Sequence, residues 1–177
     1  MIFFILLLVL TATAWLAHAL GVPRLQEPAA RMRLALVAAL LFFGTDHLLT
    51  PERYLPMVQG MVPWPQFIVV FTGVCELAGA AGLLVPRWRR LAGIMLAIYF
   101  IVVFPANIRN AIQGLSVAGL PEAQWYYWIR LVFQPVAVWW ALFSAGVTPW
   151  PLSRRRPQLS AGSLSAVAGK PATQGGE

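Results

Sequence analysis

The sequence predicts an all-α fold, a multi-pass transmembrane helical bundle, and three observations lead to that fold class. Hydrophobic residues make up 59% of the 177 residues and charged residues only 11%, a composition outside the range of soluble domains. Five apolar segments are each near the length at which a helix crosses a bilayer. Prolines and aromatic residues, which suit interfacial loops, lie between them. The segments are residues 2–20, 34–49, 67–85, 91–108 and 128–147.

The first segment has two readings. As a transmembrane helix it forms an N-terminal unit of residues 1–22. As a secretory signal peptide it would be cleaved near Ala17-His18-Ala19, which resembles a small-residue cleavage site. No basic residue precedes the apolar run, however, and cleavage would leave the Arg154–Arg156 cluster outside. We therefore expect the segment to remain as a membrane helix.

The second and third segments carry charges at membrane depth. The uncharged part of the second ends at Thr45, and Asp46 and His47 follow it, so these two side chains need a polar, protein-lined environment. Glu76 is the only charged residue between Gln66 and Val85. A carboxylate at this depth persists mainly where a partner, a cavity or a proton compensates it. Small residues share its helix face and would let a neighbouring helix approach: Thr72, Gly73, Gly79 and Ala80. Glu76 is therefore expected to face protein.

The last two segments add polar groups near one end of the bundle. Pro105 is expected to break or kink the fourth segment, and Asn107, Arg109 and Asn110 follow it. On the fifth, Tyr126, Arg130 and Gln134 share one face at i, i+4, i+8 spacing. Two loops complete this end: the proline-rich residues 50–66, and a connection over about residues 113–128 that ends in the aromatic stretch Trp125-Tyr126-Tyr127-Trp128.

The basic residues predict the topology. With the N-terminus outside and five crossings, only Arg53, Arg109 and Arg130 lie on the outer side, while the other basic residues are cytoplasmic. We expect a bacterial cytoplasmic (inner) membrane protein with a disordered cytoplasmic tail at residues 153–177. The net charge of +7 then reflects topology and contacts with the lipid bilayer, so no nucleic acid partner is expected.

The polar residues inside the spans are the candidate site. His47 and Glu76 are the candidate catalytic residues, exchanging protons near neutral pH. Arg130 is expected to pair with Glu76 or Asp46. The candidate ligand-binding residues are Asp46, Asn107, Arg130 and Gln134. The alternative is a structural network that holds the helices together. The single Cys75, two separated histidines and the lack of HExxH, GxGxxG or P-loop motifs predict no metal and no intrinsic cofactor.

Several short motifs occur in a fixed order along the chain. They are Gly44-x-x-His47 with Pro51 and Tyr54, Met61-Val62-Pro63-Trp64-Pro65, Gly73-x-x-Glu76 with Gly79 and Gly82, Phe104-Pro105-Ala106-Asn107, and Arg130-x-x-x-Gln134. In this order they resemble the DoxX-like family of small bacterial integral membrane proteins. The resemblance implies a four-helix transmembrane domain, here residues 32–149, with the first segment as an additional N-terminal helix. It also implies a link to quinone-dependent redox complexes, and selects His47, Glu76, Asn107, Arg130 and Gln134.

The leading hypothesis is a membrane subunit of a quinone-linked oxidoreductase system, not an autonomous enzyme. Quinone would bind in a polar pocket in the outer half of the bundle, and a membrane or peripheral redox partner protein would supply the redox centre. His47 and Glu76 would shuttle protons while Arg130 or Asn107 orients a carbonyl. Two alternatives remain: a non-catalytic membrane scaffold or assembly factor, and a small-solute or proton carrier.

Overall fold

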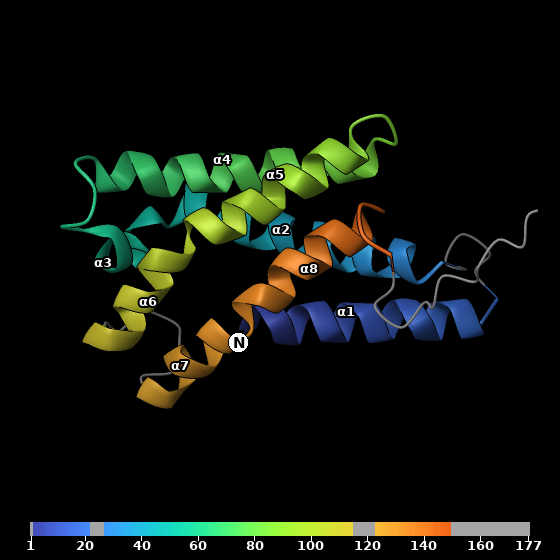
Figure 1. The fold of residues 1–177 in the computed structure, drawn as a ribbon, viewed down its shortest axis with the longest axis horizontal. Helices are drawn as coiled ribbons and strands as arrows, with labels where there is room; N and C mark the ends of the chain where they lie inside the picture. Colours follow the sequence, from blue (N-terminus) through green and yellow to red (C-terminus); the bar gives the residue numbers. More distant parts are fainter. Residues whose placement is uncertain (1, 22–26, 115–122, 150–177) are drawn as a thin grey trace, which may run out of the picture.

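The structure is a computed structural model and describes residues 2–21, 27–114 and 123–149 (Figure 1). Every regular element within these ranges is a helix, which confirms the all-α fold class. The elements are α1 (Ile2–Ala19), α2 (Pro28–Leu49), η2 (Pro51–Arg53), α3 (Leu55–Val58), α4 (Pro65–Leu84), α5 (Arg89–Val102), α6 (Phe104–Gln113), α7 (Gln124–Val132) and α8 (Gln134–Ser144). Four stretches in the described part are long and apolar enough to cross a membrane: α1, α2, α4 and α5 with α6.

Prolines break the fourth and fifth predicted segments. Pro105 lies in the first turn of α6 and Pro135 in the first turn of α8, so that α5 ends before α6 and α7 before α8. Proline lacks the N–H that an uninterrupted helix needs, and its ring crowds the preceding turn. The break at Pro105 was predicted. The expectation of one continuous helix over residues 128–147 was wrong, because Pro135 divides that segment.

Glycines allow a close approach of α2 to α4. A Cβ on Gly73 would lie 2.9 Å from the carbonyl oxygen of Gly44 and 2.8 Å from Cβ of His47. Further along α4, Gly79 packs directly against the side chain of Leu96 in α5. The predicted small-residue face of the third segment is therefore an interhelical contact, as expected for membrane bundles.

A continuous apolar core fills the end of the bundle away from α3, α6 and α7. Leu36, Leu40, Leu83 and Leu96 are almost completely buried there. Two long-range hydrogen bonds connect α2 to α8 at this end: Trp140 Nε1 donates to the Met32 carbonyl (3.0 Å), and Arg33 donates to the Ser144 carbonyl (3.1 Å). The predicted site residues lie toward the opposite end, where Figure 1 shows α3, α6 and α7.

Part of the predicted topology concerns residues outside the described ranges. Arg24, Arg154–Arg156, Lys170 and the predicted disordered tail of residues 153–177 all lie there, as does part of the linker before α7.

Candidate functional site

One cavity of about 330 Å³ opens between the helices at the α3 end of the bundle. All six predicted site residues line it: Asp46, His47, Glu76, Asn107, Arg130 and Gln134. The predicted face of Tyr126, Arg130 and Gln134 also lines it as a unit, even though α7 and α8 are separate helices. Most of the remaining wall is apolar, with aromatic rings from α1, α2 and α5, including Phe3, Phe43 and Phe100. The cavity is therefore a polar site enclosed by apolar walls.

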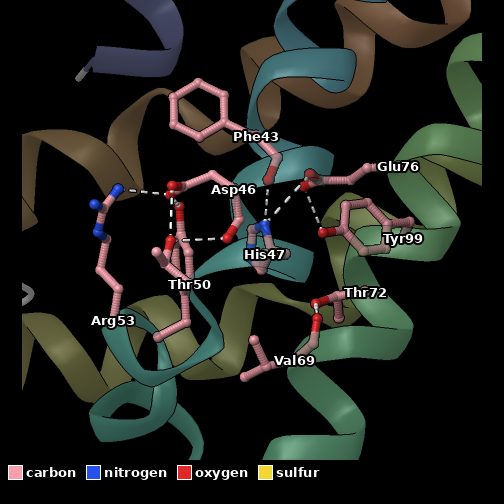
Figure 2. A network of polar contacts seen from close by, with 10 residues as sticks. Phe43, Asp46, His47, Thr50, Arg53, Val69, Thr72, Glu76 and Tyr99 are labelled. Carbon is pink, nitrogen blue, oxygen red and sulfur yellow. Dashed lines mark hydrogen bonds and ion pairs between the residues drawn. The ribbon is translucent and has the colours of Figure 1, made fainter.

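The central polar cluster joins α2, α4 and α5 (Figure 2). Tyr99 donates its hydroxyl proton to Oε1 of Glu76 at 2.7 Å. Nδ1 of His47 lies 3.5 Å from Oε2 of Glu76 and 2.8 Å from the carbonyl oxygen of Phe43. Because a carbonyl only accepts hydrogen bonds, Nδ1 carries a proton. Glu76 is only 6% exposed, which confirms that it faces protein.

The contact between two glycines creates this cluster. His47 and Glu76 each follow a glycine of the α2–α4 contact by three residues, Gly44 and Gly73 respectively. The two helices run in opposite directions (Figure 1), so Cβ of His47 lies over Gly73. Cα–Cβ bonds tilt toward a helix N-terminus, so the Glu76 side chain extends back along α4 toward His47. The spacing in Gly44-x-x-His47 and Gly73-x-x-Glu76 therefore brings the side chains of His47 and Glu76 together.

A second polar cluster surrounds Asp46 at the end of α2 (Figure 2). Its Oδ2 accepts hydrogen bonds from Arg53 Nη1 (2.7 Å) and the Tyr54 hydroxyl (2.5 Å), and its Oδ1 accepts one from Thr50 (2.8 Å). Burial and the hydrogen bond to the Asp46 carboxylate raise the pKa of Tyr54 well above its ordinary value, so the phenol keeps its proton. The Tyr54 ring stacks on His47 with ring centroids 3.9 Å apart. The two clusters are therefore in contact.

Arg130 does not form the predicted pair with Glu76 or Asp46. Within the described ranges the two ion pairs are His47 with Glu76 and Arg53 with Asp46, and the Arg130 guanidinium makes no hydrogen bond to those residues although it lines the cavity. Oε2 of Glu76 is buried and also has no hydrogen-bond partner. Among the described residues, the cavity thus presents a cation that belongs to no ion pair and a carboxylate oxygen that has no hydrogen bond.

Gln134 links the two broken segments beside the cavity. Its Nε2 donates to the carbonyl of Phe100 at 2.6 Å, and its Oε1 accepts from Asn107 Nδ2 at 3.2 Å. Phe100 lies in the last turn of α5, where backbone carbonyls lack a partner within the helix. Gln134 therefore stabilises the break at Pro105 and fixes the position of Asn107.

Three residues of the site were not predicted: Arg53, Tyr54 and Tyr99. Tyr99 lies inside an apolar run and gives no separate signal, whereas Tyr54 and Arg53 were assigned to an interfacial loop. Arg109, which the sequence grouped with the pocket, lies outside the cavity lining and instead donates to the Gln59 carbonyl and to Gln113. No group of three His, Cys, Asp or Glu side chains in the described part of the chain has the arrangement of a metal site.

Residues 36–145, well over half of the chain, match the family described as "Domain of unknown function (DUF8561)". The chain belongs to this family. The DUF8561 segment contains all six predicted site residues together with Tyr54 and Tyr99, whereas α1 precedes it. Part of the cavity wall therefore comes from outside the DUF8561 segment, namely from Ile2, Phe3 and Phe4. No curated protein and no solved structure matches the chain.

Proposed function

We propose that the protein is a membrane subunit of a quinone-linked oxidoreductase system and binds the quinone ring in the cavity. The observation that carries the proposal is the cavity itself: aromatic walls line a space that contains Oε2 of Glu76, which has no hydrogen-bond partner, and the Arg130 guanidinium, which belongs to neither ion pair of the described residues. Its volume of about 330 Å³ lies at the lower end of the usual range for small-molecule sites. A flat, mostly apolar ring with two carbonyl oxygens suits such a site.

The residues provide what quinone chemistry requires. Reduction of a quinone to a quinol takes up two electrons and two protons, and hydrogen-bond donors at the carbonyl oxygens favour it. Arg130 is available as a donor, and His47 and Glu76 form a pair that holds and passes protons. Asp46, Tyr54 and Arg53 extend the polar groups from His47 toward the surface, where the Arg53 side chain is 38% exposed. The electrons come from the redox centre of a partner protein.

The membrane arrangement forms part of the same proposal. We place the protein in a bacterial inner membrane with the N-terminus outside, the C-terminus cytoplasmic and the cavity in the outer half. In this arrangement α7 and α8 together make the fifth crossing, and residues 32–149 form a DoxX-like core to which α1 is added. The asymmetry of the basic residues supports the orientation, and the motif order from Gly44 to Gln134 supports the resemblance.

Native mass spectrometry of the gently solubilised protein tests the proposal, with quinones extracted from the same sample. The wild type is expected to carry bound quinone, and Arg130→Gln is expected to lose it because a shorter, neutral amide replaces the charged guanidinium donor to the carbonyl. Arg109→Gln makes the same chemical change outside the cavity lining and is expected to retain quinone. If the wild type carries no quinone, or if Arg130→Gln carries as much as the wild type, the proposal is wrong.

The same measurement identifies the alternatives. A stoichiometric protein partner without quinone would indicate a scaffold or assembly factor, for which the loop of residues 50–66 with its exposed Trp64 offers a contact surface. Solute or proton flux into liposomes that contain only the purified protein would indicate a carrier instead.

A further inference from the structure

The charge balance of the cavity narrows the class of ligand. We propose that the cavity binds an acidic ring as its anion, such as a hydroxyquinone or a related acidic phenol, with Arg130 as the counterion, and that the His47–Glu76 pair takes up one proton on binding. This inference rests on the proposed function and makes its ligand more specific.

Arg130 is the cation that the two carboxylates of the cavity leave unpaired. Asp46 and Arg53 neutralise each other at 2.7 Å, and Glu76 accepts its hydrogen bond from a neutral phenol, Tyr99. Arg130 contacts neither carboxylate, although a guanidinium in apolar surroundings is stable only when it is paired and hydrogen-bonded. An anionic oxygen on the ligand provides both, because charge-assisted hydrogen bonds to guanidinium are the strong ones.

Binding of an anion changes the net charge of the cavity, and a proton can compensate it. With Glu76 ionised and His47 neutral, the two carboxylates and two guanidinium groups around the cavity cancel. A bound anion would leave one net negative charge in an apolar enclosure, which is unfavourable. Protonation of either Glu76 or His47 restores neutrality, and Oε2 of Glu76 is free to take a proton because it has no hydrogen bond. The other titratable or charged side chains that line the cavity are Asp46, Arg53, Tyr54, Tyr99, Tyr126 and Arg130.

Two ligands that differ in one group provide the test. The first is a naphthoquinone with an acidic hydroxyl on the quinone ring, ionised at neutral pH; the second is its methyl ether, which has the same ring and no acidic proton. Isothermal titration into the full-length protein in detergent is expected to give about 10- to 100-fold tighter binding for the hydroxylated ring, the range of one charge-assisted hydrogen bond.

Variants assign this preference to the cavity. Arg130→Gln is expected to remove the preference for the anion, whereas Arg130→Lys, which keeps the charge, and Arg109→Gln, which lies outside the lining, are expected to retain it. Titrations in two buffers with different protonation enthalpies are expected to show uptake of about one proton per bound anion in the wild type. In Glu76→Gln the cavity already lacks one negative charge, so the anion is expected to bind without proton uptake.

The outcomes separate the two proposals. Equal affinity for the hydroxylated ring and the ether would overturn the anion proposal while leaving quinone binding intact. A preference for the anion that survives in a folded Arg130→Gln, checked by its thermal unfolding midpoint, would overturn the role of Arg130. Anion binding without proton uptake in the wild type would overturn the role of the His47–Glu76 pair. Failure of both ligands to bind would contradict the proposed function as well.

Discussion

The two sides of the cavity satisfy their polar groups in different ways. On the α2–α4 side, Asp46, His47 and Glu76 all contact protein partners across helices held together at glycines. The α6–α7 side contributes Asn107 and Tyr126 to the lining, and Asn110 and Tyr127 lie on the same two helices outside the lining. Asn110 is completely buried but neither of its side-chain polar atoms has a hydrogen-bond partner, and the buried Tyr127 hydroxyl also has none. Buried polar groups normally find partners. On the α2–α4 side each of the three side chains therefore has a protein partner, although Oε2 of Glu76 itself makes no hydrogen bond, whereas on the α6–α7 side the side chains of Asn110 and Tyr127 have no hydrogen-bond partner at all.

Gly73→Ala is expected to have the largest effect, because it disrupts the α2–α4 side at its closest contact. The new Cβ would meet the Gly44 carbonyl at 2.9 Å and His47 Cβ at 2.8 Å, and neither backbone can yield without separating the helices. Overpacking of this kind typically costs about 1–3 kcal/mol of unfolding free energy. Unfolding in a denaturing detergent measures it.

A control on the same helix separates the effect of the clash with α2 from the effect of a larger side chain alone. Ala78 is on the exposed face of α4, so Ala78→Val adds volume without a neighbour and should change stability little. Equal stability of Gly73→Ala and the wild type would show that the contact between α2 and α4 is looser than the structure indicates.

Loss of the hydrogen bond between Tyr99 and Glu76 is expected to have the next largest effect on the unfolding free energy. Tyr99→Phe removes the donor to a buried carboxylate and is expected to destabilise the protein by about 1–3 kcal/mol. Combined with Glu76→Gln in a double-mutant cycle, it should show a coupling energy of about 0.5–3 kcal/mol in the unfolding free energy.

Tyr127→Phe is the matched control from the other side of the cavity. This tyrosine is only 1% exposed, and its hydroxyl has no hydrogen bond to lose, so its replacement should be close to neutral. Strictly additive effects of Tyr99→Phe and Glu76→Gln would argue that the two side chains do not interact.

Much of the site could be predicted because charged or amide side chains in apolar segments have few environments open to them. Glu76 had to face protein, and the i, i+4, i+8 spacing of Tyr126, Arg130 and Gln134 placed them on one face. The geometry bears out both expectations. The break at Pro135 could also have been predicted, since the reasoning applied to Pro105 holds there equally.

The choice of partners could not be predicted. Asp46 pairs with Arg53, seven residues away around the end of α2, and not with Arg130, because that turn brings the loop back over the helix end. Tyr99 reaches Glu76 only through the packing of α4 against α5. The first contact depends on the shape of the turn after α2 and the second on the packing of α4 against α5, and the pattern of apolar and polar residues specifies neither.

Two asparagines in one helix differ in their partners, and the smallest effect is expected from the one whose side chain has none. Asn107 and Asn110 are both buried in α6, 7% and 0% exposed, but only Asn107 makes a side-chain hydrogen bond, to Gln134. Asn107→Leu leaves Gln134 Oε1 unpaired and should cost about 1–3 kcal/mol of unfolding free energy. Asn110→Leu removes an amide that has no partner, so it should be neutral or stabilising, because an unpaired buried amide is itself unfavourable. Thermal unfolding midpoints of the two variants, compared in one detergent, measure the difference. A loss of stability in Asn110→Leu as large as that in Asn107→Leu would show that Asn110 is hydrogen-bonded after all, and the contrast between the two sides of the cavity would then no longer hold.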